Sequence, residues 1–255
     1  MTDSATYPSL KDRVVFVSGG GSGIGASIVE HFCRQDAKVG FVDVDEKSSR
    51  ELVAAMTDAG YHKPHFLPCD LRDIEALRGA IAEVRSALGP ITVLINNAAN
   101  DQRHDIDEVT PEFWDDRFAV NLKHQFFAAQ ATYPDMEAAG GGAIVNVGSV
   151  SWMIGQGGMP CYTTAKSAVA GLTRALARDL GPKNIRVNCV VPGWIMTQRQ
   201  IDLWLTPEAE EDLMKSQCLK RKLYPEDIAK AVLFFASDDA GAFTNQSYVA
   251  DGGWV

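Results

Sequence analysis

Short apolar segments rich in β-branched residues alternate with amphipathic segments from one end of the chain to the other. The apolar segments predict strands at residues 13–19, 38–44, 65–70, 91–97, 142–149, 185–191 and 247–253. The segments with helical spacing predict helices at about 24–37, 47–60, 73–88, 111–138, 160–180 and 225–236. Because strands that are apolar along most of their length are buried on both faces, the pattern indicates a parallel sheet between two layers of helices.

No repeat, low-complexity stretch or linker-like change of composition divides these elements. We therefore predict an α/β fold in which residues 1–255 form a single doubly wound domain with a seven-stranded parallel sheet. Ligands of such sheets bind at the carboxyl ends of the strands. Functional residues are thus expected directly after each strand, and the region of about 194–222, after the sixth strand, is expected to form a lid.

A glycine-rich turn, SGGGSGIG (18–25), joins the first predicted strand to the first helix. Glycine at 19, 23 and 25 allows a tight turn and lets backbone N–H groups approach a pyrophosphate, and the helix N-terminus adds the positive end of its dipole. A plain flexible turn would need neither the strand before it nor the helix after it. The turn therefore predicts a dinucleotide site made by Gly19, Ser22, Gly23, Ile24 and Gly25.

An acidic residue, Asp43, ends the second predicted strand 20 residues after Gly23. This is the position at which dinucleotide-binding domains place a carboxylate for the adenosine ribose hydroxyls. Asp43, with Asp45 and Glu46 beside it, would repel a 2′-phosphate, so the segment favours NAD over NADP. A solvated aspartate at a strand end is the alternative interpretation.

The stretch CYTTAK (161–166) places Tyr162 and Lys166 one turn apart on the same face of a predicted helix. A free tyrosine has a pKa near 10 and is a poor base at neutral pH. A lysine ammonium about 5 Å away favours the phenolate by about 3 kcal/mol, which corresponds to a drop of about two pKa units. The pair is either an ordinary structural contact or a general base that takes an alcohol proton while a hydride leaves for the cofactor.

The order and spacing of eight motifs resemble the short-chain dehydrogenase/reductase superfamily over essentially the full length. The motifs are SGGGSGIG, CDL (69–71), NNAA (96–99), VNL (120–122), GSVS (148–151), YTTAK (162–166), VPGWIMT (191–197) and VADGGW (249–254). The resemblance implies a Rossmann-type fold and a nicotinamide cofactor. It also implies that Tyr162 is the catalytic acid/base and that Lys166, Ser149 and Asn121 assist it.

Apart from the resemblance, Ser149 at a strand end can hold the substrate oxygen near the tyrosine. Asn121 is unfavourable in a helix interior. Its amide could anchor a water for proton relay, but a helix kink or a surface amide explains it equally well. Two positions depart from the superfamily pattern, since Ala99 and Asn245 stand where glycine is usual. Neither position bears on a catalytic group, and both affect only local backbone.

The remaining cofactor residues are predicted after the other strands. Asp70 would meet the adenine edge, the backbone of Asn97 would pass the ribose, and Thr197 would bind the carboxamide or a phosphate. The additional cofactor-binding residues are then Asp70, Leu71, Asn97, Ala98, Pro192, Gly193, Ile195 and Thr197, together with Tyr162 and Lys166.

The loops after the fourth, fifth and sixth strands carry many amides and several tryptophans. An acyl or steroid pocket would be mostly apolar, whereas amides beside indole faces suit a polyol or a sugar. The predicted substrate residues are Asn100, His104, Ser149, Trp152, Gln156, Tyr162, Trp194 and Gln198. Other members of these loops, such as Arg103 and Arg199, are explained equally well as solvated side chains, and Trp204 as a subunit contact.

Six further stretches resemble bacterial NAD-dependent sugar 1-dehydrogenases of the D-xylose and L-arabinose type. They are YPSLK (7–11), NAANDQRH (97–104), GSVSW (148–152), TQRQ (197–200), WLTPEAE (204–210) and QCLKRK (217–222). This resemblance implies oxidation of an aldose, with a pentose favoured, at C1 to the aldonolactone with NAD as acceptor. The alternatives are a general alcohol dehydrogenase or 3-oxoacyl reductase, and a non-catalytic NAD-binding sensor.

Composition and charge limit the classes of partner that the protein is expected to bind. The net charge of −9 and the pI of about 5.0 argue against a nucleic-acid or anionic-membrane partner, which would call for a basic face. His62 and His65 are separated by Pro64, which spoils a helical ligand face, so we expect no metal.

Five dispersed cysteines fit reduced thiols, and the first residues lack the apolar core of a signal peptide. We therefore predict a cytoplasmic location. The superfamily resemblance implies a homotetramer whose interfaces use long helices and the last strand.

Overall fold

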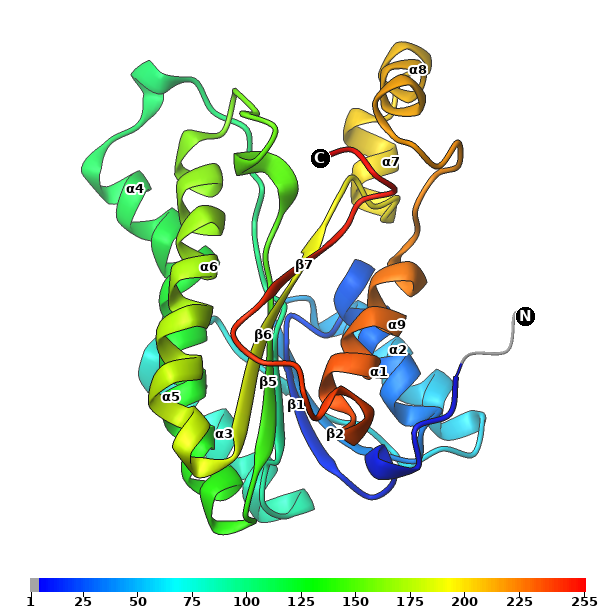
Figure 1. Cartoon of the computed structure of the whole chain (residues 1–255), viewed down its shortest axis with the longest axis vertical. Helices are drawn as coiled ribbons and strands as arrows, with labels where there is room; N and C mark the ends of the chain where they lie inside the picture. Colours follow the sequence, from blue (N-terminus) through cyan, green and yellow to red (C-terminus); the bar gives the residue numbers. More distant parts are fainter. Residues whose placement is uncertain (1–4) are drawn as a thin grey trace.

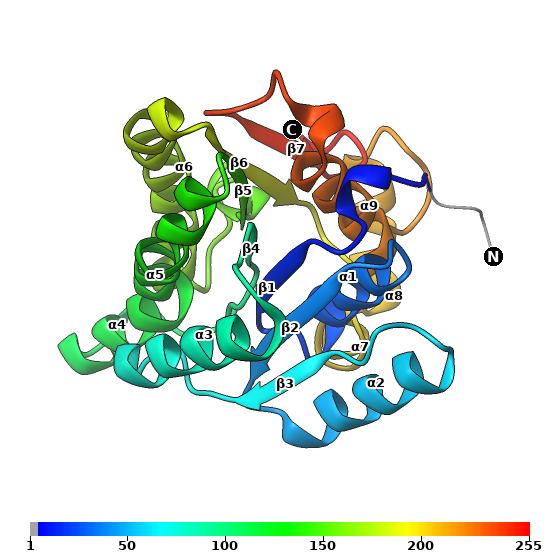
Figure 2. The ribbon, with the colours of Figure 1, turned by 90° about the horizontal axis from the view of Figure 1, so that it is seen from below.

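Seven parallel strands form one sheet at the centre of the computed structural model, which describes residues 5–255. The strands are β1 (Val14–Ser18), β2 (Lys38–Asp43), β3 (His65–Pro68), β4 (Val93–Asn96), β5 (Gly142–Val147), β6 (Ile185–Pro192) and β7 (Ser247–Ala250). Their order across the sheet is β3-β2-β1-β4-β5-β6-β7. Figure 2 shows this order in a view that looks along the strands. The predicted doubly wound α/β fold is confirmed.

Helices cover both faces of this sheet (Figures 1 and 2). One face carries α3 (Ile74–Leu88), α4 (Pro111–Phe118), α5 (His124–Ala138) and α6 (Pro160–Leu180), and the other carries α1 (Gly23–Cys33), α2 (Glu46–Asp58) and α9 (Pro225–Ala236). The two layers create the two main hydrophobic cores, one on each side of the sheet.

Strand β1 shows why a buried central strand is apolar on both faces, since its first four residues, Val14 to Val17, are all apolar. Val15 and Val17 pack into the core beneath α1 and α9, whereas Phe16 packs into the opposite core with residues of α3. All three side chains are fully buried. Each contributes about 1.5–3 kcal/mol of hydrophobic free energy, so a polar residue on either face of the strand would be costly.

The single helix predicted for residues 111–138 is interrupted. Helix α4 ends at Phe118, a π-helical turn spans Ala119–Lys123, and α5 then begins at His124. The prediction of one regular helix is wrong here because a π turn inserts a residue without changing the amphipathic pattern at either end. Such turns occur frequently at functional sites, and this one contains Asn121.

The last strand is shorter than predicted. Residues 247–253 read as one strand, but β7 ends at Ala250 and the backbone of Gly252 and Gly253 has φ values of 74° and 81°. The Asp251 carboxylate accepts hydrogen bonds from the N–H groups of Gly253 and Val255, at 2.8 and 3.0 Å. This turn closes the chain beside the carboxyl end of β6.

Two short helices, α7 (Gln198–Trp204) and α8 (Pro207–Ser216), lie beyond the carboxyl ends of the strands, between β6 and α9 (Figure 1). Threonine side chains cap both of them, because Thr197 and Thr206 accept hydrogen bonds from the N–H groups of Gln200 and Ala209. These helices occupy the region predicted to be a lid, residues 194–222. Among residues 5–255, no helix is long and apolar enough to cross a bilayer.

Candidate active site

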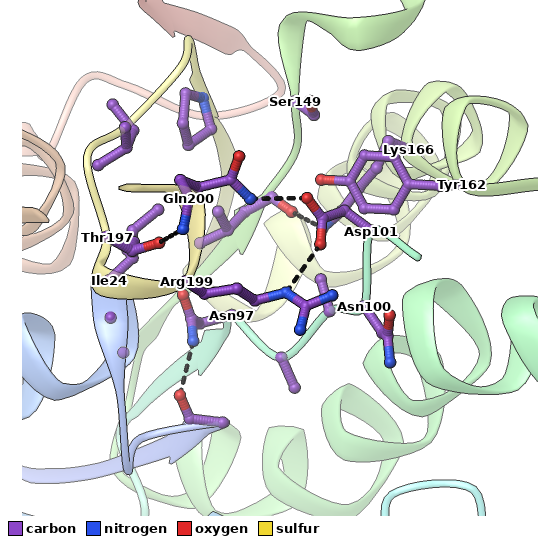
Figure 3. Close-up of a pocket in the computed structure, with 18 of the residues that line it drawn as sticks. Ile24, Asn97, Asn100, Asp101, Ser149, Tyr162, Lys166, Thr197, Arg199 and Gln200 are labelled. Carbon is purple, nitrogen blue, oxygen red and sulfur yellow. Dashed lines mark hydrogen bonds and ion pairs between the residues drawn. The ribbon is translucent and has the colours of Figure 1, made fainter. Parts of the chain in front are cut away.

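A cavity of about 720 Å³ opens at the carboxyl ends of the strands, between the glycine-rich turn and α7 (Figure 3). It brings together residues from the first strand–helix turn, the loops after the middle strands and the region after β6. The predicted site residues that line it are Gly19, Ser22, Gly23, Ile24, Gly25, Asp43, Asp70, Leu71, Asn97, Ala98, Asn100, Ser149, Gln156, Tyr162, Lys166, Pro192, Gly193, Trp194, Ile195, Thr197 and Gln198.

The turn between β1 and α1 has room for a phosphate group only because its glycines have no side chains. A Cβ atom on Gly25 would lie 1.8 Å from the carbonyl oxygen of Gly19. Gly19 and Gly23 have φ values of 67° and 54°, which glycine adopts without strain. The Ser22 side chain makes no capping hydrogen bond to the first turn of α1, so the N–H groups of that turn are not satisfied by it. This cradle fits a dinucleotide pyrophosphate.

Asn97 fixes the turn from the neighbouring strand. Its side-chain amide donates hydrogen bonds to the carbonyl oxygens of Gly19 and Ser18, at 2.8 and 3.2 Å, and Figure 3 shows it beside the turn. The hydroxyl of Ser18 in turn accepts from the N–H groups of Asn97 and Ala98. The ends of β1 and β4 are therefore joined where the cavity begins.

Asp43 is held rigidly at the end of β2. Its carboxylate accepts hydrogen bonds from the N–H groups of Gly21 and Asp45, at 2.8 and 2.9 Å. Asp70, after the next strand, is paired with Arg72, whose hydrogen bonds hold the pKa of that carboxyl below its ordinary value. Arg72 also binds Asp116, so its charge is shared between two carboxylates. The adenosine end of the cavity is therefore negatively charged.

Tyr162 and Lys166 lie in the first turns of α6, which starts at Pro160, and Ser149 follows β5. The lysine is buried, with an exposed fraction of 2%. Its ammonium donates a hydrogen bond of 2.7 Å to the carbonyl oxygen of Val147 and lies 5.8 Å from the centre of the Tyr162 ring. The predicted cluster of Ser149, Tyr162 and Lys166 thus meets at one wall of the cavity (Figure 3).

The pKa of Tyr162 corrects one expectation. The sequence spacing predicts that Lys166 lowers it, but burial, the largest cause, raises the pKa of Tyr162 to about 12, and the charge of Asp101 acts in the same direction. The Ser149 hydroxyl and Arg103 act in the opposite direction. The Lys166 ammonium, 5.8 Å from the centre of the ring, does not offset this desolvation, and its own burial lowers the pKa of Lys166 to about 8.

Asn121 is fully buried and does not line the cavity. Its amide oxygen accepts a hydrogen bond of 2.8 Å from the N–H group of Asn100, and its amide nitrogen donates one of 2.8 Å to the carbonyl oxygen of Arg117. The structure therefore contradicts the surface-amide alternative. From the π turn, Asn121 holds the loop that follows β4.

Two predicted substrate residues lie outside the cavity. His104 is buried against the Phe113 ring, and its ring nitrogens bond to the carbonyl oxygen of Gln102 and the N–H group of Cys161. Trp152 lies in a short 3₁₀ turn and is 37% exposed. Both follow strands as predicted, but His104 is used to pack its own loop and Trp152 does not line the cavity.

Several cavity residues were not among the predicted site residues. Gln200 and Arg199 of α7 donate hydrogen bonds to the two carboxylate oxygens of Asp101, at 2.7 and 3.3 Å (Figure 3). Arg103 lies over the ring of Trp204, with 5.1 Å between the guanidinium carbon and the ring centre. Asp101 and Arg103 lie in the stretch NAANDQRH (97–104), and Arg199 and Gln200 lie in TQRQ (197–200). Sequence spacing does not show which faces of the loop and of α7 turn toward each other.

Comparison with known proteins agrees with this geometry. The family model described as enoyl-(acyl carrier protein) reductase matches residues 19–255. The chain is 47% identical to D-xylose 1-dehydrogenase of Caulobacter vibrioides over 98% of this chain and 99% of that protein. It is also 47% identical to the protein named "Probable galactose dehydrogenase GalD" of Rhizobium meliloti, over 98% of both. A double mutant of a short-chain dehydrogenase/reductase from Serratia marcescens superposes with a TM-score of 0.89 at 33% identity, covering 96% of this chain and 99% of that one.

Proposed function

Because the chain belongs to the short-chain dehydrogenase/reductase family, whose dehydrogenases use a nicotinamide cofactor, we propose that it is an aldose 1-dehydrogenase. In this proposal an aldose, with a pentose favoured, is oxidised at C1 to the aldonolactone by hydride transfer to NAD. The observation that carries the proposal is the 47% identity, over nearly the full length, to two proteins named as sugar dehydrogenases. The amide side chains of Asn100, Gln156 and Gln198 in the cavity lining agree with it.

Tyr162 is the proposed general base. Its phenolate takes the proton of the C1 hydroxyl, while Ser149 donates a hydrogen bond to the same substrate oxygen and holds it in place. An oxidised nicotinamide, when bound, supplies the acceptor for the hydride that leaves C1. Lys166, buried behind the tyrosine, would supply positive charge that favours the phenolate and would hold the ribose of a bound nicotinamide.

Asn121 completes the proposed catalytic set without touching the cavity. Because it holds the N–H group of Asn100, it positions the loop that lines the substrate end. Six of the proposed substrate residues line the cavity once His104 and Trp152 are set aside: Asn100, Ser149, Gln156, Tyr162, Trp194 and Gln198.

Asp43 supports NAD over NADP. Among the described residues that line the cavity, the basic ones are Arg103, Lys166 and Arg199, and all three belong to the substrate end or the catalytic wall. A 2′-phosphate at the adenosine end would instead meet Asp43, whose carboxylate is fixed by two backbone N–H groups. Arg72, the cation beside Asp70, is already paired with Asp70 and Asp116, so the phosphorylated cofactor should bind more weakly.

We also propose that residues 1–255 form one dinucleotide-binding and catalytic domain with residues 194–222 as its lid, and that it acts in the cytoplasm as a homotetramer. Large apolar side chains exposed on the proposed interface elements support the assembly; they are Trp114 on α4, Phe126 on α5, and Val249 on β7. Light scattering on the purified protein tests the tetramer, and a monomer at micromolar concentration would contradict it.

The activity is tested by following NADH formation with D-xylose, L-arabinose, D-galactose, D-glucose and cyclopentanol. We expect turnover of the aldoses, with a pentose giving the highest kcat/KM, and a lower kcat/KM with NADP than with NAD. Oxidation of cyclopentanol with no aldose turned over would favour the general alcohol dehydrogenase. NAD binding without any turnover would favour the sensor.

A further inference from the structure

Asp101 is a carboxylate close to the catalytic wall for which the proposed chemistry has no use. It lies in the loop after β4, lines the cavity, and has a side chain that is only 17% exposed. Figure 3 shows it between Tyr162 on one side and Arg199 and Gln200 on the other. It therefore lies where the part of a substrate away from the reacting carbon would be placed.

The carboxylate is fixed in position by α7. Gln200 donates a hydrogen bond to Oδ2 at 2.7 Å, and Arg199 donates one to Oδ1 at 3.3 Å. The amide oxygen of Gln200 accepts in turn from the indole N–H of Trp194, at 2.9 Å. Each carboxylate oxygen can accept about two hydrogen bonds, so each retains capacity for one more.

A negative charge at this point disfavours deprotonation of Tyr162, the proposed base. The charge of Asp101 raises the pKa of Tyr162, whereas Arg103 from the same loop lowers it, and Lys166 of α6 lies over the tyrosine ring. The ion pair with Arg199 offsets only part of the cost. A carboxylate that is retained beside a general base, and held there by two donors, indicates a binding role. Neutral hydroxyl groups are its natural partners, since an anionic substrate would be repelled.

We propose that Asp101 is a specificity-determining residue that accepts hydrogen bonds from substrate hydroxyls other than the one oxidised, and that Gln200 is the positioning residue that orients its carboxylate. This inference rests on the proposed function, because it concerns how the aldose is recognised. It extends that function by assigning the selectivity for polyhydroxylated substrates to the pair formed by the β4 loop and α7.

The test combines a variant with modified substrates. Kinetics of wild type and Asp101→Asn are measured with D-xylose and with its 2-deoxy, 3-deoxy and 4-deoxy analogues. Loss of the recognised hydroxyl should lower kcat/KM of the wild type about 10- to 100-fold, mainly through KM, because a hydrogen bond to a charged group is lost. In Asp101→Asn, the same deoxy substitution should lower kcat/KM by less than about threefold.

Asp107→Asn is the matched control, because it removes the same charge from an exposed residue a few positions along the chain that does not line the cavity. It should keep the wild-type response to every deoxy analogue. Asp101→Asn should also move the acidic limb of the pH profile of kcat/KM to lower pH, because the charge that raises the pKa of Tyr162 is gone, and Asp107→Asn should not.

A second variant guards against misfolding of the first. Gln200→Glu leaves Asp101 intact but places a carboxylate against it, and should weaken the same deoxy response. If both variants lower kcat/KM equally for all four substrates, the carboxylate serves only to hold α7 and the inference is wrong. If the wild type oxidises no aldose, the proposed function and this inference fail together; if it oxidises aldoses but neither variant changes the deoxy response, only the inference fails.

Discussion

Among single residues, the catalytic pair shows burial and charge acting against each other. Burial raises the pKa of Tyr162 to about 12 and lowers that of Lys166 to about 8. Both shifts disfavour the charged forms that the proposed mechanism requires. Arg103 offsets part of this cost by lowering the pKa of Tyr162, and the Lys166 ammonium lies 5.8 Å from the centre of the ring.

Replacing Tyr162 with phenylalanine removes the hydroxyl and little else. Turnover should fall by about 10²- to 10⁴-fold, the usual contribution of a positioned base, while the Kd for NAD changes little. Steady-state kinetics and fluorescence titration of the cofactor measure the two quantities. Tyr133→Phe, which alters a tyrosine on α5 away from the cavity, is the control. Substantial activity in Tyr162→Phe would refute the assignment of the base.

Lys166 should make stability depend on pH. Burial lowers its pKa to about 8 in the folded protein from the ordinary value of 10.5, so the unfolded chain binds more protons between these limits. The contribution to stability is therefore complete above about pH 10.5 and is lost as the pH falls through 8.

Between about pH 7 and about pH 10, the wild type should gain about 2 kcal/mol in unfolding free energy relative to Lys166→Met, since groups that Lys166 does not influence titrate equally in both. Urea unfolding at both pH values measures this difference. A constant difference between the two proteins would mean that the buried lysine keeps an ordinary pKa.

Among the secondary-structure elements, the turn before α1 depends most strictly on residue type. Gly25→Ala would place a methyl group against the carbonyl oxygen of Gly19, so the turn must open. We expect the Kd for NAD to rise at least about tenfold, because N–H groups no longer converge on the pyrophosphate.

Gly79→Ala is the matched control on α3, where a Cβ atom meets nothing within 4 Å. This change should stabilise the protein by up to about 1 kcal/mol, since alanine is the better helix former, and leave NAD binding unchanged. Thermal unfolding and cofactor titration of both variants provide the comparison. Equal effects of the two substitutions would argue against a special role for the turn.

For the molecule as a whole, cofactor binding should stabilise the folded chain against unfolding. Because residues from the β1 turn to the segment after β6 line the cavity, a dinucleotide that bridges them binds only the folded chain. At a concentration about 100 times its Kd, NAD should raise the unfolding temperature by about 5 °C.

NADP at the same concentration should give a smaller shift, and Asp43→Asn should reduce the difference between the two cofactors. Differential scanning fluorimetry measures all four combinations. An equal or larger shift with NADP on the wild type would show that the fixed carboxylate of Asp43 does not select the cofactor.

Local pattern alone determined the order and type of the main elements. A run such as VVFV at β1 must be buried on both faces wherever it lies, and the glycines at 19, 23 and 25 permit a turn that other residues would strain. The spacing of Tyr162 and Lys166 likewise places both on one helix face in any context. These are consequences of backbone geometry and side-chain chemistry within a few residues.

Tertiary structure decided what depends on distant neighbours. The π turn that places Asn121, the packing of His104 beneath its own loop, and the exposure of Trp152 each follow from contacts across the fold. The pKa of Tyr162 follows from burial, which no spacing reveals, and Asp101 meets Gln200 only because β4 and β6 end at the same edge of the sheet. Periodicity encodes which side chains share a face, whereas desolvation and partner choice belong to the assembled cavity.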